Sequence, residues 1–174
     1  MRFISLLLLS FQALFALEYA YTIPNAYLQE RMNSEFPIVK EALFITLEIS
    51  EPKLKLKPES QGFDFSATLK IPNIQDHKGR VAKAMVSMSA KIAYSKGGNI
   101  YLRKIKVLDI QSSFIANDMK PMLYSTIAQQ LNSYYKNRPI YALGDDEGMA
   151  NIAVEAVEKM VIVAEGIKVV FKIL

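Results

Sequence analysis

The chain has 174 residues, no cysteine, a single histidine and a formal net charge of +4 at pH 7. The lack of cysteine excludes disulfide bonds, thiolate nucleophiles and thiolate metal sites, and one histidine excludes any mechanism that requires two imidazoles. The basic excess is mild and spread along the chain, unlike the dense Lys/Arg face of nucleic-acid-binding proteins, so we expect no nucleic-acid partner. This length fits one domain, which at this size buries roughly 70% of the surface that its unfolded chain exposes.

The N-terminus has the pattern of a signal peptide. Arg2 gives a basic start, the run from Phe3 to Leu17 is almost wholly apolar, and the small residues Ala16 and Ala20 suit cleavage. The run of about 15 residues is shorter than the roughly 20 that a transmembrane helix needs. We therefore expect residues 1–20 to be a signal peptide that is cleaved after Ala16 or Ala20.

The rest of the chain, residues 21–174, shows no internal repeat, low-complexity tract or linker, so we expect a single domain there. No second stretch is apolar enough to span a bilayer. The mature protein is therefore expected in the periplasm of a Gram-negative cell. The alternative that the pattern leaves open is an uncleaved N-terminus that anchors the protein in the inner membrane.

A short strand and a helix are expected next. Residues 18–23 are rich in β-prone side chains, and Pro24 suits the first turn of a helix that ends before Pro37. The apolar stripe of this helix, spaced by four residues, consists of Leu28, Met32 and Phe36.

The middle of the chain alternates apolar and polar residues, which predicts a series of long strands. The apolar parity switches near Glu51-Pro52 and again near Arg103-Lys104, so a β-bulge is required at each place. Gly97-Gly98-Asn99 indicates a hairpin turn. Long bulged strands bend, and a bent sheet can wrap around a helix. The strands are expected at residues 43–57, 63–71, 82–94 and 100–107.

The helix that such a sheet would wrap is expected from Met119 to Tyr135. Asn117 and Asp118 are candidate caps before it, and Pro139 follows it. Its apolar stripe consists of Met119, Met122, Leu123, Ile127, Leu131 and Tyr134.

Three more elements are expected near the C-terminus. Residues 140–143 form a short strand, a second helix has apolar residues spaced by threes and fours from Met149 to Met160, and residues 167–173 alternate as a terminal strand after Gly166. The acidic residues Asp145 to Glu147 precede the second helix, where negative charge is favourable. Consecutive carboxylates diverge and do not close a cage, so we expect no metal there.

No catalytic constellation is expected. His77 lies in a polar loop and is interpreted as a solvated side chain. The hairpin glycines are not followed by the helix that a phosphate-binding loop requires. We therefore expect a protein that is not an enzyme, with no cofactor and no bound metal.

Two basic stretches allow two interpretations. Lys53, Lys55 and Lys57 alternate with leucines in an expected strand, and a second cluster lies at residues 103–106. Each cluster either makes peripheral contact with an anionic membrane surface or forms a solvated strand face, where lysines also discourage edge-to-edge pairing.

The remaining signal is apolar. One face of each of two strands and one face of the long helix either form a closed core or leave a groove or tunnel for an apolar ligand. Methionines suit the second interpretation, because their flexible side chains accommodate varied partners. The candidate lining residues are Phe63, Phe65, Leu69, Ile71, Val86, Met88, Ile92, Met119, Met122, Leu123, Ile127 and Leu131.

Three groups of residues occur in a recognisable order. Tyr21-Thr22-Ile23 precedes a helix, and the segment from Gly98 to Leu102 leads to Val107-Leu108-Asp109. The C-terminal group consists of Leu131, Tyr135, Pro139, Tyr141, Leu143 and Gly166. In this order, over nearly the whole mature chain, they resemble the YceB family of bacterial envelope lipoproteins, whose function is unknown.

The resemblance implies a fold and a role. The YceB fold is similar to that of tubular lipid-binding (TULIP) proteins, in which a strongly curved antiparallel sheet wraps a long helix around an apolar channel. This implies binding of a lipid or another apolar small molecule. The lipidated cysteine of the family is missing, since the chain has no cysteine, so a periplasmic protein without a lipid anchor is implied.

We therefore expect an α+β fold, with a strongly curved antiparallel β-sheet wrapped around a long α-helix and with one N-terminal and one further C-terminal helix. The expected function is non-catalytic binding of a lipid or other apolar ligand in an interior groove or tunnel of an exported protein. The alternative is an envelope protein-interaction or structural factor with a closed core and no ligand.

Overall fold

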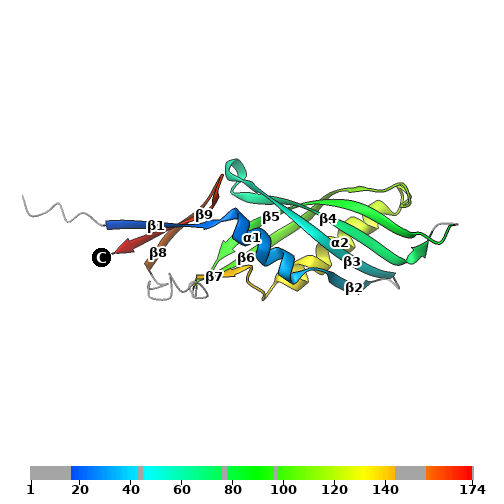
Figure 1. Cartoon of the computed structure of the whole chain (residues 1–174), viewed down its shortest axis with the longest axis horizontal. Helices are drawn as coiled ribbons and strands as arrows, with labels where there is room; N and C mark the ends of the chain where they lie inside the picture. The colour runs from blue at the N-terminus through cyan, green and yellow to red at the C-terminus, as the bar shows by residue number, and fades with distance from the viewer. Residues whose placement is uncertain (1–16, 43–44, 76–77, 96–97, 144–155, 174) are drawn as a thin grey trace, which may run out of the picture.

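The computed structural model describes residues 17–42, 45–75, 78–95, 98–143 and 156–173. In these ranges the chain is an α+β protein with two antiparallel sheets and two α-helices, and most residues lie in strands (Figure 1). The helices are α1 (Asn25–Glu35) and α2 (Lys120–Tyr135), with a short 3₁₀ helix, η1 (Pro58–Ser60). The strands are β1 (Leu17–Pro24), β2 (Ile38–Ala42), β3 (Ile45–Lys57), β4 (Gly62–Gln75), β5 (Val81–Tyr94), β6 (Asn99–Gln111), β7 (Tyr141–Ala142), β8 (Val157–Val163) and β9 (Gly166–Ile173).

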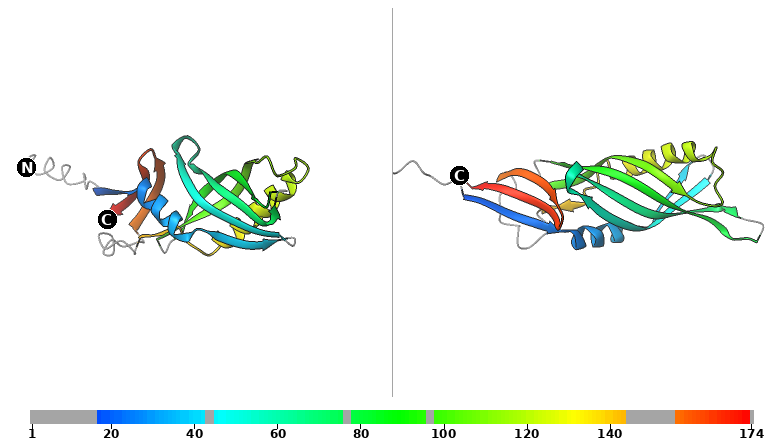
Figure 2. Two further views of the ribbon diagram at one scale, coloured as in Figure 1. Left: turned by 45° about the vertical axis from the view of Figure 1, so that its right-hand side comes forward. Right: turned by 90° about the horizontal axis from the view of Figure 1, so that it is seen from above.

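The molecule is elongated, and the two sheets follow one another along its length (Figures 1 and 2). The small sheet of β1, β8 and β9 lies at one end, and the far ends of β4 and β5 lie at the other. α1 connects the two parts. At its start the Asn25 N–H donates to the Glu165 carbonyl at 2.8 Å, and its buried Leu28 and Met32 belong to the core that the large sheet shares.

The large sheet has the order β2-β3-β4-β5-β6-β7, so strands that are neighbours in the sheet are also neighbours in the chain. The β3–β4 register shifts between Ser50 and Lys53, where Glu51 has a φ of 54°. The β5–β6 register shifts twice, and Lys104 beside the shift between Ser89 and Lys91 has a φ of 53°. Both bulges that the apolar parity requires are therefore confirmed. Each contains a residue with a left-handed backbone conformation, which is uncommon for residues other than glycine.

The small sheet has the order β1-β9-β8 and joins the two ends of the described chain. β1 and β9 pair from Leu17 opposite Ile173 to Pro24 opposite Gly166. A Cβ atom at Gly166 would collide with the backbone carbonyl of Ile23, so this close crossing of the two strands requires glycine.

The expected second C-terminal helix is wrong in its last part. Residues 157–160 lie in β8, and residues 144–155 are outside the described ranges. Val157, Val161 and Val163 favour a strand, because β-branched side chains pack well on a pleated surface and lose rotamer freedom in a helix. Pairing with β9 supplies backbone hydrogen bonds that the spacing of apolar residues does not reveal.

The long helix is confirmed as α2, and its apolar stripe belongs to the core. Its buried residues spaced by four, each at most 1% exposed, are Leu123, Ile127, Leu131 and Tyr135. Complete burial of one large apolar side chain contributes roughly 1.5–3 kcal/mol. The last residue of the stripe is Tyr135 and not the expected Tyr134. Tyr134 and Met119 are partly buried, and Met122 is exposed.

Two side-chain amides close strand edges in the way that a neighbouring strand would. Gln29 of α1 donates to the Pro52 carbonyl at 2.7 Å and accepts from the Leu54 N–H at 2.7 Å. Asn132 of α2 donates to the Ile105 carbonyl at 2.8 Å and accepts from the N–H of the same residue at 3.0 Å. Each amide satisfies one N–H and one C=O on the bulged part of a strand, which attaches the helices to β3 and β6.

A third amide links the two sheets. Gln61, between η1 and β4, donates to the Ile162 carbonyl at 3.1 Å and accepts from the Ile162 N–H at 2.8 Å. Ile162 belongs to β8 in the small sheet, whereas η1 connects β3 to β4 in the large one. The Gln61 side chain is therefore a direct hydrogen-bonded bridge between the sheets.

Candidate functional site

The expected apolar lining residues come together in one interior cluster. Nine of the twelve are at most 2% exposed, namely Phe63, Phe65, Leu69, Ile71, Val86, Met88, Leu123, Ile127 and Leu131. Ile92 and Met119 are partly buried against this cluster, and Met122 is 41% exposed. The inner face of β4 and β5 and the buried side of α2 thus form one continuous apolar interior, which approaches the surface near the start of α2.

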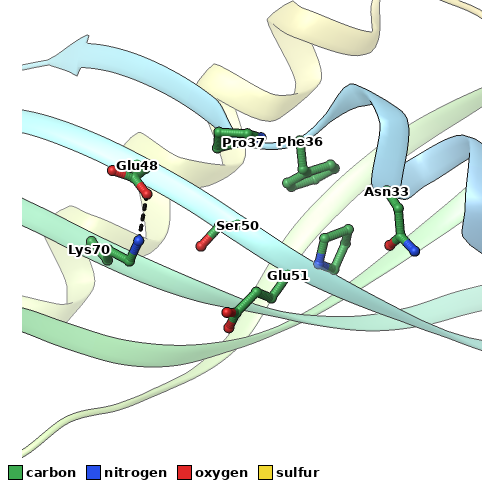
Figure 3. A pocket seen from close by; sticks show the side chains of 8 residues that line it. Asn33, Phe36, Pro37, Glu48, Ser50, Glu51 and Lys70 are labelled. Carbon is green, nitrogen blue, oxygen red and sulfur yellow. Dashed lines mark hydrogen bonds and ion pairs between the residues drawn. The ribbon is translucent and has the colours of Figure 1, made fainter.

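Two hollows lined entirely by described residues open on the polar side of the large sheet. The first, of about 530 Å³, lies between the end of α1 and the bulge of β3 (Figure 3). Its lining residues are Asn33, Phe36, Pro37, Glu48, Ser50, Glu51, Pro52 and Lys70. Phenylalanine and the two prolines give it apolar walls, and the remaining lining side chains are polar.

The charges around the first hollow are mostly compensated. Lys70 forms an ion pair of 2.7 Å with Glu48, and this hydrogen bond raises the pKa of Lys70 (Figure 3). The Thr68 hydroxyl donates to Glu51 at 2.8 Å. Glu48 and Lys70 neutralise one another, so the net charge of the lining is the negative charge of Glu51. This charge disfavours an anionic ligand.

The second hollow, of about 280 Å³, has the opposite charge. Lys53 and Lys55 of β3 lie along it, next to Ser66 of β4 and Ser87 of β5. Its remaining lining residues are Leu54, Asp64, Phe65, Met88 and Leu108. These are the lysines that the sequence pattern singled out, and the fold places their hollow on the side of the sheet opposite to the apolar interior.

The ends of α1 and α2 meet at a buried polar junction. Glu35 Oε2 and the Tyr135 hydroxyl are both buried, and neither has a hydrogen-bond partner among the described residues. Burial raises the pKa of Glu35, while Arg31 and Arg138 act in the opposite direction. Burial, and next the charge of Glu35, raise the pKa of Tyr135 far above its ordinary value. The junction therefore brings a buried carboxyl oxygen and a buried hydroxyl close together.

A known family covers most of this structure. The chain matches the family described as "Protein of unknown function (DUF1439)" over residues 24–166. It belongs to this family. The matched part runs from the last residue of β1 to the first residue of β9, so it contains the whole large sheet, both helices and β8. No curated protein matches the chain.

This member of DUF1439 shows no metal-binding group of three or more His, Cys, Asp or Glu side chains within the described ranges. His77 and the acidic residues 145–147 lie outside those ranges. In the described part of the chain, no helix is long and apolar enough to cross a bilayer.

Sequence patterns did not identify the junction of Glu35 and Tyr135. The two residues are far apart in the chain, and Glu35 stands at a helix end, where a charged residue is ordinary. One signal was present, because Tyr135 continues the spacing of four from Leu123 through Leu131. That spacing places its hydroxyl inside the molecule, where it requires a polar neighbour.

Proposed function

We propose that this protein is an exported, non-catalytic binding protein for a lipid or another apolar ligand, with the tubular lipid-binding architecture to which the YceB resemblance points. The ligand would lie between the inner face of β4 and β5 and the buried side of α2. The observation that carries the proposal is the continuous apolar interior formed by the nine buried lining residues. A ligand chain would replace side-chain contacts of equal polarity, so its burial would be favourable.

Access to the interior would be easiest at the start of α2. Near the end of the helix, Asn132 is bonded twice to Ile105, and Arg103 donates to the Tyr135 carbonyl at 3.0 Å. In the first half of the helix, the Tyr124 hydroxyl is 3.4 Å from Asp109, which is a weak hydrogen bond. The first turns of α2 are therefore the part that an entering apolar chain would displace at least cost.

The near-complete burial of the same residues also favours a second function. The nine lining residues are almost completely buried against one another, as expected for a closed core. The alternative function is therefore an envelope protein-interaction or structural factor that carries no ligand.

Recovery of a bound ligand tests the proposal directly. The protein would be purified after export, extracted with organic solvent and analysed by mass spectrometry, and the stripped protein would be titrated with a fluorescent fatty acid. A stoichiometric lipid in the extract and saturable uptake are the expected results. An empty extract together with no uptake would leave only the closed-core function.

A filling substitution separates the two functions. Ala67 on the inner face of β4 is 3% exposed, and Ala67→Leu adds volume to the interior. If a ligand occupies space there, the variant loses uptake and keeps its stability. If the core is closed, overpacking costs about 1–3 kcal/mol and changes no uptake. Ala26→Leu, at an exposed position of α1, is the matched control and should change neither quantity.

A further inference from the structure

The outer face of the large sheet carries positive charge that the apolar interior does not explain. Lys53 and Lys55 lie along the hollow of about 280 Å³, next to the hydroxyls of Ser66 and Ser87. Within the described part of the chain, neither lysine has an ion pair and neither serine hydroxyl has a hydrogen bond. The hollow therefore presents two ammonium groups and two hydroxyls that are all available to a ligand.

Two other charges close to this hollow are compensated by ion pairs, whereas Asp109 of β6, which lies opposite Ser87, has no ion pair in the described ranges. Asp64 also lines it, but its carboxylate is 3.2 Å from the Lys57 ammonium. Lys70, on the next strand, is paired with Glu48 at 2.7 Å. Because paired charges largely cancel at a distance, Lys53 and Lys55 are the lining charges that remain, and they outnumber the single carboxylate of Asp109 beside the hollow.

Apolar side chains stand beside this positive charge. Leu108 lines the hollow, Met85 lies on the same face of β5, and each is 54% exposed. Leu108 is the extra residue of a β5–β6 bulge distinct from the one at Lys104, since the register passes from Ser87 opposite Asp109 to Met88 opposite Val107. The bulge thus turns a leucine toward solvent next to two unpaired cations.

We propose that this face docks on an anionic lipid surface, with Lys53 and Lys55 binding lipid phosphates and with Leu108 and Met85 contacting the acyl-chain region. Phosphate oxygens complement both the ammonium groups and the free hydroxyls of the hollow. A dissolved phosphate would gain nothing from the two exposed apolar side chains, whereas an anionic membrane offers partners for charge and apolar surface together. This argument favours a membrane over a soluble anion.

The docking face is independent of the proposed interior ligand. It lies on the opposite side of β4 and β5 from the apolar cluster, so a protein with a closed core would dock equally well. Vesicle binding without lipid uptake would support this inference and overturn the proposed function. Lipid uptake without vesicle binding would do the reverse.

Co-sedimentation of the purified protein with vesicles tests the inference. Binding is expected with phosphatidylcholine containing phosphatidylglycerol, and not with phosphatidylcholine alone. The double variant Lys53→Glu with Lys55→Glu should lose at least about tenfold in affinity. Lys168→Glu with Lys172→Glu is the matched control, because both lysines of β9 are exposed and have no ion pair in the described ranges. It changes the net charge equally and should keep binding.

The apolar contact has its own variant. Leu108→Ser with Met85→Ser should weaken binding to the anionic vesicles without lowering the melting temperature, since both residues are largely exposed. Two results would overturn the inference. One is an equal loss in the β9 control, which would mean unspecific attraction of charge. The other is full competition by inorganic phosphate with no effect of the serine variant, which would identify a site for a dissolved anion.

Discussion

The two sheets of this protein are assembled in different ways. The six-stranded sheet pairs strands that follow one another in the chain, whereas the three-stranded sheet pairs β1 with β9 from opposite ends of the described chain. Contacts between neighbouring segments cost less loop-closure entropy than contacts between distant ones. The family match also contains the large sheet but ends at the edges of the β1–β9 pair. The family match thus covers the large sheet with its helices and β8, and contains only the terminal residues of β1 and β9.

The largest expected effect concerns the N-terminal end of β1. Cleavage of the proposed signal peptide after Ala16 leaves β1 complete, whereas cleavage after Ala20 removes the pairs from Leu17–Ile173 to Ala20–Val170. Losing about four ladder hydrogen bonds should lower the free energy of unfolding by about 2–4 kcal/mol. We therefore expect the exported protein to begin at Leu17, as measured by intact mass.

The stability of two purified forms checks the reason for this expectation. Urea unfolding would compare a chain that begins at Leu17 with one that begins at Tyr21. The shorter form also lacks Tyr19, whose ring centroid is 6.0 Å from that of Phe171. Equal midpoints for the two forms would show that the first half of β1 contributes nothing, and the choice of cleavage site would lose its physical basis.

A smaller effect is expected at the bridge between the sheets. Gln61→Met keeps the length of the side chain but leaves the Ile162 N–H and C=O without their partner. Unsatisfied polar groups cost about 1–3 kcal/mol when buried, and Ile162 is buried. Hydrogen exchange should become faster in β8 and remain unchanged in β5 at the centre of the large sheet. Equal acceleration in both strands would contradict the view that Gln61 acts mainly on the small sheet.

Sequence patterns were informative where burial alternates along one strand. The parity changes near Glu51 and Lys104 located the bulges at these two places, because a single extra residue moves every later side chain to the other face. The spacing of Leu123, Ile127 and Leu131 identified α2, because residues four apart lie on the same face of a helix. In both cases the pattern reports a local geometry that the residues themselves determine.

Patterns failed where a distant partner decides the outcome. Apolar residues spaced by threes and fours up to Met160 suggested a helix, but β9 provides a strand partner for Val157–Val163. The amides of Gln29, Gln61 and Asn132 carry no pattern at all, since a glutamine on a surface and one that closes a strand edge look alike in sequence. Such contacts between the sheets and helices become visible only in the fold.

The smallest expected effect concerns Glu35, at the end of α1 that lies on the large sheet. Burial raises its pKa above the ordinary value of 4.5, so the folded state holds the proton more tightly than the unfolded state does. Below that ordinary value Glu35 is neutral in both states and destabilises neither. As the pH rises through the raised pKa, ionisation of the buried carboxyl group lowers the free energy of unfolding.

Glu35→Gln removes this charge while retaining the shape of the side chain. The variant should therefore gain stability relative to the wild type as the pH rises from 4 to 7, as measured by thermal unfolding across that range. Glu30→Gln, at an exposed position of the same helix, is the control and should show no such trend. A variant that instead loses stability near neutral pH would mean that Arg31 and Arg138 hold the carboxylate strongly enough to outweigh its burial. The junction between α1 and α2 would then be an ionic contact that fastens the end of α1 to the segment that follows α2.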